Sequence, residues 1–114
     1  PERSSIALGA RLFEDMVQRM PDIDAIFFCN DDIAQGGLLA ANRLQIAVPG
    51  RIAIAGFNDL AGSAQMVPPL TTIRTPRGEV GQAGATMLLG LMRGTLEQPQ
   101  CIDLDYELIV REST

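Results

Sequence analysis

Hydrophobic and polar positions follow two periods along the chain, one typical of helices and one typical of strands. In three stretches apolar residues recur three and four positions apart, which predicts amphipathic helices. Short unbroken apolar runs stand between these stretches and are typical of strands buried in a parallel sheet. In chain order, the predicted elements are a helix from Ser4 or Ser5 to about Met20, a strand over 24–29, a helix over 31–44, a strand over 52–57, a strand over 70–73, a helix from Pro76 to about Gly94, and a strand over 102–110.

The second half of the chain carries weaker signals. Residues 59–69 lack a clear period, which predicts a loop with a short helical turn. The side chains that the last helix is expected to turn inward are Val80, Ala83, Met87, Leu88 and Leu91. Apolar and acidic residues then alternate from Ile102 to Val110, which predicts a half-exposed strand or a pair of strands with a bend. This order of elements predicts the α/β class, with a mainly parallel sheet.

Polar residues follow two of the apolar runs at the point where each strand is expected to end. Asn30, Asp31 and Asp32 follow the first run, and Asn58 and Asp59 follow the second. Parallel strands end at a common edge of the sheet, and α/β proteins bind ligands at this edge. An amide offers donors and an acceptor, and a carboxylate accepts from two hydroxyls. The sequence therefore predicts a site for a polyhydroxyl small molecule.

Each of these residues also has a structural interpretation. Asp31 and Asp32 could cap the following helix, which is the favoured interpretation for Asp32 and one of two for Asp31. Asn30 could brace the loop, and Asn58 could simply form a turn. Phe57 is expected in the core, with stacking on a ligand as the alternative.

Composition narrows the possible chemistry. The 114 residues are 46% hydrophobic and 20% charged, which fits one globular domain or part of one. A net charge of −5 gives the chain's own surface no electrostatic reason to bind nucleic acid. The absence of His removes His-based metal sites, acid–base catalysis by His, and activation of Cys29 as a nucleophile. With no metal-ligand pattern, no cofactor motif and no catalytic set, the chain is not expected to be an enzyme.

Cations and glycines supply the remaining candidates. Arg74 and Arg77 could pair with an anionic ligand, although a solvated charge is the usual outcome. The glycines within 78–84 stand inside a helix pattern, so they indicate close packing rather than a phosphate site. Gly36 and Gly37 each cost a helix about 1 kcal/mol. This cost implies a close approach to a sheet or to another subunit.

Four segments together resemble the C-terminal part of the LacI/GalR family of bacterial transcription regulators. They are 25–36 (AIFFCNDDIAQG), 48–59 (VPGRIAIAGFND), 68–73 (PPLTTI) and 108–114 (LIVREST). The resemblance extends over nearly the whole chain with the segments in order. Within the family, the runs at 29–32, 53–57 and 75–77 look most like the gluconate-operon repressors.

The resemblance implies the fold of periplasmic sugar-binding proteins, in which two Rossmann-like subdomains, with helices on both faces of a parallel sheet, enclose a ligand cleft. Residues 1–68 and 103–114 would belong to the C-terminal subdomain, and 71–93 would cross to the N-terminal one. The DNA-binding headpiece would lie upstream of Pro1, which is not a Met and so indicates a piece of a longer protein. Half a cleft should bind ligand poorly, because affinity needs burial from both sides.

The resemblance also assigns site residues. Asn30 matches a ligand-contacting position, and Asn58 matches a ligand-contacting position that is usually Asp in the family. An amide there repels an anion less than a carboxylate does. Together with the gluconate-operon resemblance, this favours a sugar acid as the effector. The family dimerises through the C-terminal subdomain, and the matching positions are Gln35, Leu38, Leu39, Gln65 and Met66, of which the two leucines could instead be core.

The implied function is the effector-binding and dimerisation part of a cytoplasmic regulator. Its partners would be a sugar or sugar-acid effector, a second copy of the chain, and operator DNA through the headpiece. The alternative is a periplasmic sugar-binding protein of a transport system, which an upstream signal peptide would favour. The 114 residues contain no signal-peptide pattern and no run long enough to span a bilayer. A small Rossmann-like enzyme lacks a supporting catalytic set.

Overall fold

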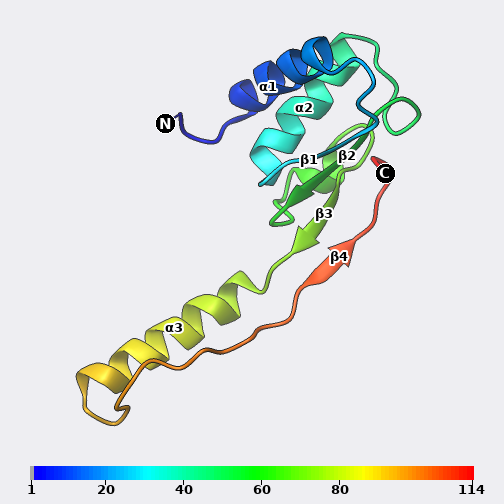
Figure 1. Ribbon diagram of the computed structural model, residues 1–114. Helices are drawn as coiled ribbons and strands as arrows, with labels where there is room; N and C mark the ends of the chain where they lie inside the picture. Colours follow the sequence, from blue (N-terminus) through cyan, green and yellow to red (C-terminus); the bar gives the residue numbers. More distant parts are fainter. Residues whose placement is uncertain (1) are drawn as a thin grey trace. The chain divides into compact units, whose positions relative to one another are not determined.

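The computed structural model describes residues 2–114 and divides into two compact units. Unit 1 comprises the described residues up to Arg74 together with Leu108–Thr114, and unit 2 is Thr75–Glu107. The elements, drawn in Figure 1, are α1 (Ile6–Arg19), β1 (Ala25–Phe27), α2 (Asp31–Arg43), β2 (Ala53–Phe57), the short 3-10 helix η1 (Ser63–Gln65), β3 (Thr71–Arg74), α3 (Arg77–Met92) and β4 (Glu107–Ile109). Each element predicted from the periodicity is present, and the short helical turn expected in 59–69 is η1.

The strands form one open sheet with the order β1-β2-β3-β4. β1 pairs with β2 in parallel, with Ile26 opposite Ile54, and β2 pairs with β3 in parallel, with Phe57 opposite Ile73. The α/β class with a mainly parallel sheet is therefore confirmed.

The core of unit 1 lies between the sheet and the helices α1 and α2, which run side by side (Figure 1). Phe13 of α1, Leu38 of α2 and Ile54 of β2 are fully buried in it. On the other face of β1, Ala25 is exposed and Phe27 retains 61% of its accessible surface. The expected second layer of helices is therefore not supplied at β1 by the described residues of unit 1.

Glycines set the distance between α1 and α2. A Cβ on Gly9 would lie 2.0 Å from a carbonyl oxygen of α2, and a Cβ on Gly36 would lie 2.1 Å from the carbonyl oxygen of Ile6. A Cβ on Gly37 would instead meet the ring of Phe28 at 2.8 Å. The predicted close approach is thus present, but the neighbour of Gly36 is α1 of the same chain, and neither the sheet nor another subunit as expected; Gly37 approaches the residue after β1.

The C-terminal tail is held between β2 and β3. Ser113 is fully buried, and its Oγ donates to the carbonyl oxygen of Ile54 at 2.6 Å. The same Oγ accepts from the backbone N–H of Thr71 at 2.8 Å. The backbone N–H of Ile54 donates to the carbonyl oxygen of Ser113 at 2.8 Å. One serine therefore satisfies buried backbone groups on two neighbouring strands.

Unit 2 departs from the sequence prediction in its burial. None of the residues of α3 is buried: Ala83, Met87 and Leu91 are half-buried, while Val80 and Leu88 are exposed. The predicted single inward face is wrong for unit 2 taken by itself, because apolar residues occupy several sides of α3. The final strand is also shorter than predicted, since residues 101–106 have no regular structure. Among residues 2–114, no helix has both the length and the apolar character needed to cross a lipid bilayer.

Candidate functional site

The predicted polar residues lie at the carboxyl ends of β1 and β2. Asn58 directly follows the last residue of β2, and Asn30 directly precedes α2. Since β1 and β2 are parallel and paired, both asparagines belong to the same edge of the sheet. Asn58 has φ 107° and Asp59 has φ 47°, which is the left-handed region. Such backbone costs about 1–3 kcal/mol in a residue other than glycine, and it concentrates at ligand sites.

Asn30 caps α2 and also braces the start of the chain. Its Oδ1 accepts from the backbone N–H of Ile33 at 3.0 Å, and its Nδ2 donates to Ser4 Oγ at 2.8 Å. An amide oxygen accepts two hydrogen bonds and an amide nitrogen donates two. One acceptor position and one donor position of Asn30 therefore remain for another group.

Asp31 lies behind the edge and is completely buried. Its Oδ2 accepts from Ser63 Oγ at 2.5 Å and from the backbone N–H of Leu60 at 2.8 Å, and its Oδ1 accepts from Thr72 Oγ1 at 2.6 Å. Donors of the protein occupy both carboxylate oxygens. Of the two interpretations left open by the sequence, burial supports the structural one. The capping bond of α2 itself belongs to Asn30.

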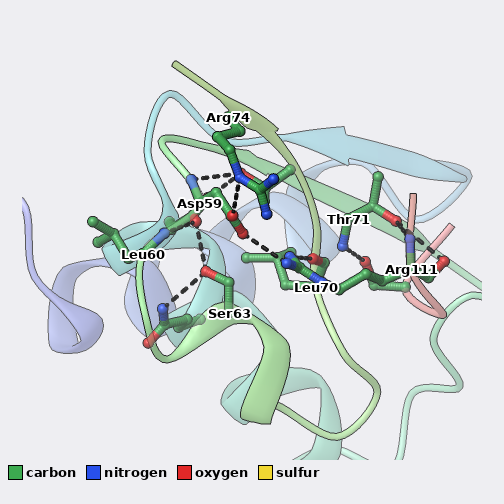
Figure 2. Close-up of polar contacts among 11 residues, drawn as sticks. Asp59, Leu60, Ser63, Leu70, Thr71, Arg74 and Arg111 are labelled. Atoms are coloured by element: carbon green, nitrogen blue, oxygen red, sulfur yellow. Dashed lines mark hydrogen bonds and ion pairs between the residues drawn. The ribbon is translucent and has the colours of Figure 1, made fainter. Parts of the chain in front are cut away.

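Asp59 forms a double ion pair that sequence reasoning missed. Figure 2 shows its carboxylate between Arg74, whose Nε donates to Oδ2 at 2.8 Å, and Arg111, whose Nη2 donates to Oδ1 at 2.7 Å. Burial raises the pKa of Asp59, but hydrogen bonds and charge from Arg111 and Arg74 outweigh it and hold that pKa below its usual value. Arg111 also donates to the carbonyl oxygen of Leu70 at 2.7 Å. Arg74 thus has a partner within the protein.

The positions that the resemblance assigns to dimerisation differ in exposure. Leu38 is a core residue with 1% of its surface exposed, which supports the core interpretation that the sequence left open for it. Gln35 is buried, and its Nε2 donates to Ser63 Oγ at 3.3 Å. Leu39 and Gln65 are exposed, and Met66 is half-buried against the core. The accessible members of the set are therefore on the outer side of α2 and in the loop around η1.

Other chemistry at the edge is limited. Phe57 is half-buried at the end of β2, so this residue is partly accessible there. Cys29 and Cys101 are exposed free thiols. In the part of the chain that the structure describes, no three His, Cys, Asp or Glu residues are placed to hold a metal ion. What the edge offers is a pair of amides, one aromatic ring and a network of buried hydrogen bonds, which is a set of binding groups.

Comparison with known proteins places this geometry in a family. A family model described as "Periplasmic binding protein-like domain" matches residues 1–114. The HTH-type transcriptional regulator GntR of Pseudomonas aeruginosa is 48% identical over all of this chain and 33% of its own length. The crystal structure of transcription regulator GntR from Chromobacterium violaceum superposes with a TM-score of 0.90 at 45% identity, over 99% of this chain and 42% of that one. A complex of transcriptional regulator CelR with cellobiose gives a TM-score of 0.91 at 26% identity, over 96% of this chain and 34% of that one.

The chain belongs to the periplasmic binding protein-like domain family. The resemblance to LacI-type regulators found in the sequence is confirmed, because the relatives and the similar structures are transcription regulators of that kind. The chain spans about a third of the length of the curated relatives it matches.

Proposed function

We propose that this chain is part of the effector-binding and dimerisation domain of a LacI-type transcription regulator that senses a sugar acid, with gluconate as the first candidate. The observation that carries the proposal is Asn58, held at the carboxyl end of β2 in the left-handed region. Its amide stands at a position where the family usually has a carboxylate, so it repels an anionic effector less. The similar structure described as a CelR–cellobiose complex supports a carbohydrate as the ligand class.

The edge residues divide the work of binding. Asn58 contacts the effector, Asn30 uses its remaining donor and acceptor positions, and Phe57 flanks the ligand. The roles proposed for these residues involve no making or breaking of a covalent bond. The proposed role is therefore binding of the effector without catalysis.

The proposed domain layout keeps the expected boundaries. Residues up to 68 and 103–114 form part of the C-terminal subdomain, and residues 71–93 cross to the N-terminal one. The division of the chain into two compact units, with changes after Arg74 and before Leu108, supports this layout. Pro1, the first residue of the expected range, lies outside the described residues.

The proposed partners are a second copy of the chain and operator DNA. Leu39, Gln65 and Met66 supply the accessible part of the dimer surface, and Gln35 braces the loop beside it. A headpiece elsewhere in the whole protein contacts the DNA in the cytoplasm. The effector acts by binding one state of the dimer more tightly than the other, because only differential affinity shifts an equilibrium.

The periplasmic transport alternative receives less support. The curated relatives at 30–48% identity carry the names of transcription regulators and repressors. No residue at the edge favours transport over regulation. The regulator proposal is therefore the one to test first.

Titration calorimetry of the full-length protein with gluconate and with glucose tests the proposal. Gluconate should bind at least tenfold more tightly than glucose. Asn58→Gly should weaken gluconate binding by about tenfold, which corresponds to about 1.4 kcal/mol, while leaving the thermal unfolding midpoint in place. Glycine is the suitable replacement because it keeps the left-handed backbone without strain. Unchanged gluconate affinity in Asn58→Gly would remove Asn58 from the site, and no gluconate binding by the wild type would overturn the proposed effector.

A further inference from the structure

The buried carboxylate of Asp31 accepts hydrogen bonds from residues that lie close to Asn58 in the chain and in the neighbouring strand. Asp31 is 0% exposed, and its three donors come from two segments of the chain: Leu60 and Ser63 in the stretch between β2 and β3 that contains η1, and Thr72 in β3. Hydrogen bonds to a charged acceptor are stronger than neutral ones, and the two hydroxyl contacts are short, at 2.5 and 2.6 Å. Asp31 therefore connects the N-terminal end of α2 to the stretch between β2 and β3 and to β3 itself.

One flank of Asn58 is bonded to Asp31 directly, and the other is linked to it through β3. The backbone N–H of Asn58 donates to the carbonyl oxygen of Ile73 at 2.8 Å, and Ile73 is the neighbour of Thr72. On the other side, Leu60 lies two residues after Asn58 and donates to Asp31. A φ of 107° is unfavourable for Asn, so the surrounding contacts must impose it.

Gly56 shows that β2 leaves room for this carboxylate. A Cβ on Gly56 would lie 2.3 Å from Asp31 Oδ1. The glycine two residues before Asn58 thus permits the carboxylate to reach Thr72 across the end of β2. The end of β2 therefore leaves space for the buried carboxylate of Asp31.

We propose that Asp31 is a positioning residue for effector recognition: it does not touch the effector, and it holds the backbone on both sides of Asn58 so that the Asn58 amide meets the ligand in one orientation. This inference rests on the proposed function. The sequence predicted direct contact between Asp31 and the ligand as one interpretation. In this proposal Asp31 instead acts through Asn58.

A matched pair of variants in the full-length protein tests the proposal. Asp31→Asn turns one acceptor oxygen into an N–H₂ donor facing the donors that Asp31 accepts from. Asp32→Asn makes the same charge change in the same turn of α2, at a half-buried residue whose side chain makes no hydrogen bond to the described residues. Gluconate affinity should fall at least tenfold in Asp31→Asn and change less than threefold in Asp32→Asn. Equal losses in the two variants would overturn the proposal.

A double-mutant cycle with Asn58→Gly separates positioning from a general structural role. If Asp31 acts through the Asn58 amide, Asp31→Asn should cost less than threefold in affinity once that amide is gone. Fully additive losses would show that Asp31 acts elsewhere. Thr72→Val removes one donor and keeps the side-chain shape. It should lower gluconate affinity less than Asp31→Asn does, with the same non-additivity, and it replaces Asp31→Asn in the cycle if that variant does not fold.

Hydrogen exchange of the effector-free protein keeps this test independent of the choice of effector. Asp31→Asn should speed amide exchange in residues 58–63 at least tenfold, while Asp32→Asn leaves it unchanged. If the wild type does not bind gluconate, the proposed effector fails, and the exchange result alone decides whether Asp31 fixes the loop. Unchanged exchange in Asp31→Asn would overturn the positioning role.

Discussion

Gly36→Ala is the sharpest test of how α2, which carries Asn30 and Asp31, is held in place. The new Cβ would lie 2.1 Å from the carbonyl oxygen of Ile6, 2.8 Å from the backbone nitrogen of Ala10 and 2.9 Å from the Cα of Gly9. All three atoms are backbone atoms, so no side chain can rotate away. Since ordinary contact begins at 3.4 Å, α1 must move by more than 1 Å relative to α2.

Two opposing effects set the magnitude. Overpacking of a well-packed core costs about 1–3 kcal/mol, and a clash between two backbones belongs at the upper end of that range. Replacing glycine by alanine inside a helix stabilises the helix by about 1 kcal/mol. The free energy of unfolding of unit 1 should therefore fall by about 2 kcal/mol.

Urea unfolding followed by circular dichroism measures this change, with Gly50→Ala as the control. A Cβ on Gly50 would lie 3.5 Å from the Cβ of Ala47, an ordinary contact, so the control should shift stability by less than about 0.5 kcal/mol. An increase in stability of about 1 kcal/mol for Gly36→Ala, combined with weaker dimerisation, would contradict the close contact between α1 and α2. That result would assign the close approach to another subunit, the alternative that the sequence alone left open.

Three further predictions concern unit 1. Ser113→Ala should lower the free energy of unfolding by about 1–3 kcal/mol in urea titrations, because it leaves the buried N–H of Thr71 without its acceptor. Phe13→Ala should cost about 3–5 kcal/mol in the same assay, because the ring is fully buried, and a cost below about 1 kcal/mol would contradict its place in the core. Since Asp59 has a lowered folded pKa, its ion pairs stabilise the fold above the ordinary Asp pKa and are lost as pH falls through the folded value. The stability difference between wild type and Asp59→Asn should therefore shrink below about pH 4, and a difference that grows there would contradict this assignment.

Local patterns were sufficient to predict where β1 and β2 end and that Asn30 and Asn58 lie at one edge of the sheet. The changes from Cys29 to Asn30 and from Phe57 to Asn58 are abrupt steps from apolar to polar, and such a step after a short apolar run is typical of the end of a parallel strand. The pairing of β1 with β2 then brings the two steps to one edge. This inference needs only the chain's local order and the rule that parallel strands end together.

The contacts behind that edge could not be predicted in the same way. Asp59 pairs with Arg111, which is 52 residues away, and Ser113 bonds to Ile54, which is 59 residues away. No local pattern predicts such partners, because in the sequence each of these residues has the pattern expected of a polar residue in contact with solvent. For Asp31, the one available signal was Gly56, whose missing Cβ leaves the space that the carboxylate fills.

The burial of α3 was misjudged for a different reason. Periodicity predicts an inward face from the residues of one helix, whereas burial also needs a partner to cover that face. Ala83 and Met87 find partial cover in unit 2, and Val80 and Leu88 do not. Sequence pattern therefore predicted the helix itself well and its burial poorly.

The proposed function requires that a small-molecule acid bound at the Asn30–Asn58 edge controls DNA binding. The most direct test is fluorescence anisotropy of the full-length protein on an operator selected from random DNA, measured with and without saturating gluconate. We expect saturating gluconate to change operator affinity at least tenfold in the wild type, and Asn58→Gly to need about tenfold more gluconate for half of that change, because its gluconate binding is about tenfold weaker. Operator affinity that stays the same at every gluconate concentration would contradict it.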